Sequence, residues 1–135
     1  MAIETNPFTP RVGVNPLSDV THIRFNGAQL AIQVANERAG EGRFRGLEVT
    51  FSDTRAFRVI DELDLYRYTQ SPGFHFGHHV LRVARGGWGS EESELQGMKG
   101  RYEGNEWLIV TGNLCVSVLS QDDPLVVESE FDNDP

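Results

Sequence analysis

The sequence contains one cysteine, one lysine and no long apolar run. Cys115 alone cannot form an intrachain disulfide, and its flanks in NLCVSVLS indicate a thiol buried in a strand rather than a nucleophile. No window reaches the length of a membrane-spanning segment, and the N-terminal MAIETNPFTPR lacks the apolar stretch of a signal peptide. We therefore expect a cytoplasmic protein of bacterial type that does not engage a membrane.

Positive charge is also scarce. The 135 residues carry 12 lysines and arginines against 20 aspartates and glutamates, which gives a net charge of −8 and a pI near 4.9. Nucleic-acid binding needs a cationic surface, so this balance argues against it. Because Lys99 is the only lysine, almost all positive charge is arginine, which suits paired contacts. The acidic excess favours either solubility alone or a basic protein partner.

Strand-forming sequence dominates what is present. Residues 20–34 alternate around Asn26-Gly27, the strongest short-range signal of a hairpin, and residues 106–120 form a second hairpin with its turn at 111–113. With the runs between them the total is about seven strands with short connections. The length fits one domain. The sequence thus predicts a mostly β, single-domain protein, an antiparallel sheet curled into a barrel or sandwich, with one short helix.

The expected organisation has three parts. Residues 1–18 contain three prolines and predict an extended N-terminal arm, residues 19–127 form the β domain, and residues 128–135 form an acidic flexible tail. The one plausible helix covers residues 90–98, with Ser90 as its N-cap and acidic residues in its first turn.

Two internal segments are less regular. Residues 37–46, ERAGEGRFRG, predict a polar, glycine-rich loop. Residues 61–70, DELDLYRYTQ, fit a short helix and a strand face equally well, so the sequence leaves their secondary structure open.

Three of the four histidines lie in HFGHH, residues 75–79. In a strand, His75 and His79 share a face but lie ~13 Å apart, while His78 and His79 point to opposite faces. Imidazoles that bind one metal ion need ring nitrogens ~2.0–2.1 Å from it. We therefore expect half-exposed histidines on a strand and no metal site or cofactor.

Catalytic motifs are equally weak. GWGSEES around Ser90 lacks the trailing glycine and the strand-to-helix elbow of a hydrolase nucleophile. GEGRFRG lacks the GK[ST] ending of a phosphate loop. Acidic residues are plentiful, but their spacing does not select a pair for glycoside hydrolysis. No catalytic residue is predicted.

A binding surface explains the remaining features. An acidic segment beside exposed aromatic rings would attract a basic partner through its field and anchor it through desolvated ring contacts. The carboxylates would meet arginine or lysine side chains of that partner. The predicted partner-binding residues are Asp61, Glu62, Asp64, Tyr66, Tyr68, Trp88, Glu91, Glu92 and Glu94.

Two stretches, FSDTRAFRVIDELDLYRY and EWLIVTGNLCVSVLS, resemble in profile the small acidic immunity proteins of bacterial toxin–immunity pairs. The resemblance covers roughly a quarter of the chain and carries no motif, so no family residue is transferred. It implies a cytoplasmic protein, monomeric or homodimeric, that occludes a toxin's active site without catalysis. Two alternatives stay open. One is a small β-barrel enzyme that acts on a small molecule through His and Asp/Glu, and the other is a structural or assembly subunit.

Overall fold

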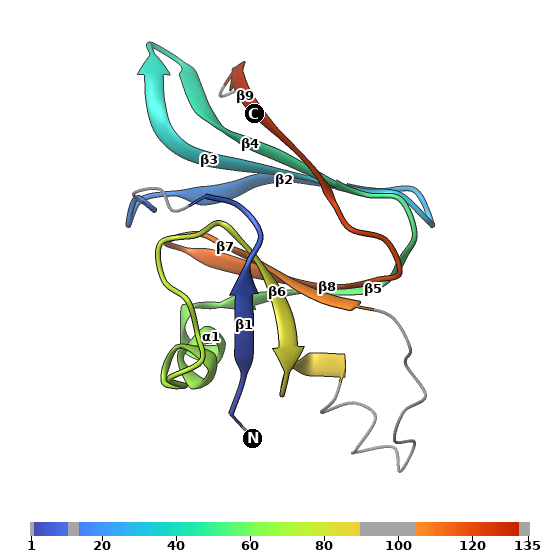
Figure 1. The fold of residues 1–135 in the computed structure, drawn as a ribbon. Helices are drawn as coiled ribbons and strands as arrows, with labels where there is room; N and C mark the ends of the chain where they lie inside the picture. Colours follow the sequence, from blue (N-terminus) through green and yellow to red (C-terminus); the bar gives the residue numbers. More distant parts are fainter. Residues whose placement is uncertain (1, 11–13, 90–104, 133–135) are drawn as a thin grey trace.

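The computed structural model describes residues 2–10, 14–89 and 105–132, which form nine strands and one α-helix (Figure 1). The elements in chain order are β1 (Glu4–Pro7), β2 (Asp19–Phe25), β3 (Leu30–Gly40), β4 (Arg43–Phe51), β5 (Thr54–Asp61), α1 (Glu62–Thr69), β6 (Val80–Arg85), β7 (Asn105–Val110), β8 (Leu114–Ser120) and β9 (Leu125–Asp132). The predicted mostly β fold with one short helix is confirmed, although the strands number nine rather than about seven. The helix predicted over residues 90–98 lies outside the described residues.

The strands form two antiparallel sheets. One has the order β1-β6-β7-β8-β5 and the other β2-β3-β4-β9. The two sheets lie one above the other, and α1 lies beside the five-stranded sheet on the side away from the second sheet (Figure 1). Within the described ranges neither sheet closes into a barrel. Both hairpins predicted from turn sequences are present, as β2–β3 and β7–β8.

The main core lies between the two sheets. Strand alternation places every second side chain of the facing strands in this space, where a continuous apolar cluster is shielded from water. The fully buried members are Leu30, Ile32, Val34, Val49, Phe51, Val80, Trp107, Ile109, Val116 and Val118. The four-stranded sheet contributes the first five, and the five-stranded sheet contributes the rest.

A second apolar cluster lies under α1, on the opposite face of the five-stranded sheet. The helix begins after Asp61, whose Oδ1 accepts a hydrogen bond from the Asp64 backbone N–H at 3.0 Å and so satisfies a free helix-end donor. Leu65 and Tyr68, three positions apart, turn inward and join this cluster. Cys115 also belongs to it, so the prediction of a buried thiol is confirmed.

The segment predicted as a loop over residues 37–46 is instead the end of a long hairpin. β3 continues to Gly40 and β4 starts at Arg43, which leaves only Glu41 and Gly42 between them. Gly42 has a φ of 69°, a left-handed conformation that favours glycine in tight turns. The loop prediction was wrong because glycines and charges were taken to end the strands, whereas they line a hairpin that extends past the core.

Both ends of the chain pair with neighbouring strands. Residues 4–7, inside the expected N-terminal arm, form β1 and pair with β6. Residues 128–132 of the expected acidic tail continue β9 and pair with β4 up to Asp132. Among the described residues no helix is long and apolar enough to cross a membrane.

Candidate functional site

The inner face of the four-stranded sheet changes character where the core ends. Leu47 of β4 and Val126 of β9 pack against the core. Residues two and four positions before Leu47, and two, four and six positions after Val126, lie on the same face of the sheet. These positions are charged rather than apolar. With their neighbour on β3 they are Glu37, Arg43, Arg45, Glu128, Glu130 and Asp132. We call these six residues the charged extension.

Ion pairs run across the charged extension. Arg45 lies between two partners, with Nη1 3.3 Å from Glu37 Oε1 and Nη2 3.7 Å from Glu130 Oε2. Arg43 Nε lies 3.7 Å from Asp132 Oδ1. All these side chains are about half exposed or more, and such pairs contribute only about 0.2–1 kcal/mol each. They orient the side chains but explain little of the stability.

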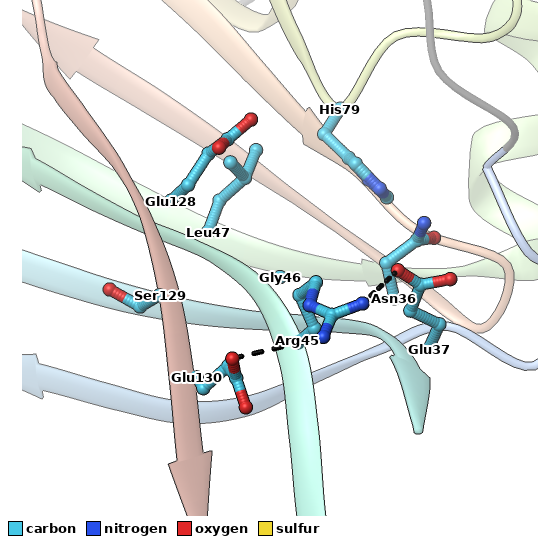
Figure 2. Close-up of a pocket in the computed structure, with 9 residues that line it drawn as sticks. All are labelled: Asn36, Glu37, Arg45, Gly46, Leu47, His79, Glu128, Ser129 and Glu130. Carbon is cyan, nitrogen blue, oxygen red and sulfur yellow. Dashed lines mark hydrogen bonds and ion pairs between the residues drawn. The ribbon is translucent and has the colours of Figure 1, made fainter. Parts of the chain in front are cut away.

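An open cavity of about 560 Å³ lies against the charged extension (Figure 2). This volume is within the range of about 300–1,000 Å³ that small-molecule sites occupy. Three carboxylates and one guanidinium line it, so its lining carries an excess of negative charge. The lining residues are Asn36, Glu37, Arg45, Gly46, Leu47, His79, Glu128, Ser129 and Glu130.

Gly46 shapes the wall of this cavity. It lies opposite Ala35, at the point where the β3–β4 register shifts between Ala35 and Glu37. A Cβ atom at position 46 would collide with the carbonyl group of Val34. Only glycine therefore lets the two strands approach here, between the apolar and the charged parts of the face.

His79 is the buried polar group of the cavity. His79 immediately precedes β6, and its side chain points toward the part of the cavity where Asn36 and Glu37 lie (Figure 2). His79 is only 2% exposed, and its Nδ1 lies 2.7 Å from the carbonyl oxygen of Val110. A carbonyl can only accept, so Nδ1 must carry the proton. In the neutral ring, Nε2 is then an acceptor.

Nε2 of His79 is buried and has no hydrogen-bond partner among the described residues. Burial lowers the pKa of His79, and the hydrogen bond to Val110 opposes this shift only in part. The ring is therefore neutral near pH 7. Nε2 is thus an acceptor of fixed orientation without a protein donor, and it is one of five buried side-chain polar atoms without a partner in the described ranges.

The other two histidines of HFGHH have different surroundings. His75 Nδ1 lies 2.9 Å from Thr5 Oγ1, and His78 Nδ1 lies 2.8 Å from the Thr9 carbonyl oxygen. Both line a second cavity of about 690 Å³, beside Phe74 and Phe76. In the described part of the chain no three His, Cys, Asp or Glu side chains are arranged to hold a metal ion.

The prediction that these histidines lie on a strand was therefore wrong, and His79 is buried rather than half-exposed. Residues 75–79 precede β6 and contain a turn at Gly77, whose φ is 89°. The turn aims the neighbouring rings in different directions, so strand alternation does not describe them.

Three of the predicted partner-binding residues lie together on α1 or at its start. Asp61 and Asp64 are exposed, and Tyr66 is 62% exposed beside Leu63, which is 84% exposed. Tyr68 is not part of this surface. It is 1% exposed, belongs to the core cluster under α1, and its hydroxyl accepts a hydrogen bond from Arg58 at 2.7 Å. The i, i+3 spacing from Leu65 that packs the helix also buries Tyr68.

Trp88 is half-buried rather than a free anchor. Its backbone N–H donates to a carboxylate oxygen of the buried Glu106 at 2.8 Å, and the Arg58 guanidinium lies 4.9 Å from its ring centroid. Gly89 donates to the other oxygen of Glu106 at 2.7 Å. GGWG is therefore a bend that leads into helical residues 88 and 89, whose backbone N–H groups bind a carboxylate. The side chain of Glu62 and residues Glu91, Glu92 and Glu94 lie outside the described residues.

Sequence reasoning did not identify the cavity. Three of its four charged residues lie in RFR of the expected loop and ESE of the expected tail, and both triplets alternate with the period of a strand. Because both segments were predicted to be irregular, this alternation was not used to predict strands.

No protein-family model matches the chain, and searches of curated proteins and of solved structures gave no match either. What the site can do therefore follows from its chemistry. It combines an acid-rich rim, a neutral imidazole acceptor and an open mouth, which together suit a cationic group that donates hydrogen bonds.

Proposed function

We propose that this chain is a non-catalytic binding protein for a basic protein partner. The observation that carries the proposal is the charged extension, a sheet face that leaves the core and surrounds an open cavity with more carboxylates than guanidinium groups. The net charge of −8 would steer a cationic partner toward the molecule over long range.

The more specific form of the proposal is a cytoplasmic, bacterial immunity protein that covers a cationic toxin domain. The resemblance in profile supports this form, and an acid-rich cavity suits a protruding arginine or lysine of such a domain. The exposed outer side of α1, with Asp64, Leu63 and Tyr66, offers a second contact region of mixed character.

Affinity purification from the native host with the full chain as bait tests this proposal. Three baits are compared: the native chain, Glu128→Lys inside the cavity, and Asp123→Lys at an exposed loop position outside it. We expect a basic protein on the native bait and on Asp123→Lys, and its loss on Glu128→Lys, because both variants change the net charge equally. The recovered protein is then purified and titrated at increasing salt, which should weaken binding.

Recovery of an acidic or neutral partner, or affinity that does not depend on salt, would overturn the proposal. Equal capture by all three baits would place the interaction away from the cavity and remove the observation on which the proposal depends.

A second candidate, an enzyme that acts on a small molecule through His and Asp/Glu, is favoured by one observation. His79 and three carboxylates line the same cavity. A neutral imidazole whose tautomer is fixed by a carbonyl can serve as a general base. Turnover of a small molecule that disappears in a folded His79→Gln variant would favour this candidate.

A further inference from the structure

The unsatisfied acceptor of His79 indicates what the cavity binds. Leaving a buried acceptor without a donor is unfavourable, and a ligand that brings the donor removes this cost. Nδ1 is already engaged with Val110, so the ring cannot turn over without losing that bond. A ligand group that reaches Nε2 must therefore bring a hydrogen-bond donor.

The rim indicates that this donor is positively charged. Arg45 is shared between Glu37 and Glu130, whereas Glu128 has no ion-pair partner among the described residues. A bound cation with N–H groups would neutralise the excess negative charge of the carboxylates and would also donate a hydrogen bond to Nε2. A metal ion fits less well, since no three ligating side chains in the described ranges converge.

We infer that the cavity binds an alkylguanidinium or alkylammonium group, with Nε2 of His79 accepting one N–H and Glu128 compensating the charge. Guanidinium and ammonium groups are donors only, which matches the unpaired Nε2 and the carboxylates that line the cavity. One source of this group is an arginine or lysine side chain of the basic partner, and for that source the inference rests on the proposed function. The other source of the same chemistry is a free amine or guanidine.

Titration of the isotope-labelled full chain, followed by nuclear magnetic resonance, tests the inference. The probes are N-acetyl-arginine amide and N-acetyl-lysine amide, with N-acetyl-citrulline amide as the neutral control of similar shape. We expect a saturable shift of the His79 Nε2 resonance and of the Glu128 carboxyl resonance with at least one cationic probe. The citrulline probe should produce neither shift.

Two matched variants locate the binding site. Glu128→Gln keeps the side-chain shape and removes the charge inside the cavity, and Asp123→Asn does the same outside it. We expect roughly tenfold weaker binding in Glu128→Gln, the size expected for one charged hydrogen bond, and unchanged binding in Asp123→Asn. Equal shifts with citrulline, or equal affinities in the two variants, would overturn the inference.

The outcomes separate the two proposals. If the partner recovered from the host competes with the cationic probe, its side chain is the occupant. If the probe binds but the partner does not compete, the cavity serves a free amine or guanidine, and the proposed protein-binding function loses its site. If the partner binds through Glu128 while His79 Nε2 does not respond to either probe, the binding function stands and the cavity inference fails.

Discussion

The two parts of one sheet face offer the clearest comparison in this molecule. On β4, Val49 and Phe51 face the five-stranded sheet and are fully buried, while Arg43 and Arg45 continue the same face and are exposed. β4 pairs with β9 in one continuous register through both parts, although the pairing of β3 with β4 shifts where the charged part begins. The covering sheet is present over the apolar part alone. The strands of this sheet are therefore longer than the core requires, and the part that extends past the core places charged side chains around a cavity.

The largest expected effect comes from the apolar part. Phe51→Ala removes a fully buried ring that packs beside Trp107, at a centroid distance of 6.2 Å. We expect a loss of about 3–5 kcal/mol in the free energy of unfolding, because the cavity left behind adds to the lost burial. Urea denaturation followed by fluorescence measures it. A loss below 1 kcal/mol would show that this face is not the core.

The next effect concerns His79, at the boundary between the two parts. Its pKa is about 6.5 in an unfolded chain and lower when folded. The unfolded state therefore binds a proton first as the pH falls, so stability is complete above about pH 6.5 and declines below it.

Urea denaturation between pH 5.5 and 7.5 measures this decline, and His79→Gln should flatten it. The charged side chains that face the same cavity are Glu37, Arg45, Glu128 and Glu130. A slope that persists in His79→Gln would assign the proton to another group.

The smallest expected effect comes from the charged part. Arg45→Ala breaks two ion pairs between half-exposed side chains, so we expect a change of about 1 kcal/mol or less in the free energy of unfolding. The same variant should shift probe affinity in the cavity, because it frees Glu37 and Glu130. A loss comparable to that of Phe51→Ala would mean that the charged extension is structural.

The sequence was informative where local chemistry decides the structure. Asn26-Gly27 and the turn at 111–113 predicted hairpins because positive φ and alternation act within a few residues. Residues 61–70 stayed ambiguous because Leu63 and Leu65 alternate as in a strand, while the capping carboxylate of Asp61 and the burial of Tyr68 depend on the packed sheet.

Local sequence patterns did not predict the candidate site. Its charged residues belong to strands whose inner face has no covering sheet, and they therefore lack the apolar alternation by which strands are recognised. His79 joins them only because a turn at Gly77 and the pairing of β6 with β7 bring it to β3 and β9. These are contacts between distant segments, which a single sequence does not encode locally.

The buried Cys115 has a practical consequence. The sulfur is enclosed between α1 and the five-stranded sheet, and burial raises the pKa of its thiol, so a sulfhydryl reagent reaches a reactive thiolate only after that layer opens. Since the chain has no second cysteine, the rate of modification reports the opening of one known layer in the unaltered protein. Binding in the cavity beside His79 can thus be followed by how far an occupant slows that reaction, without attaching any label to the surface that it binds.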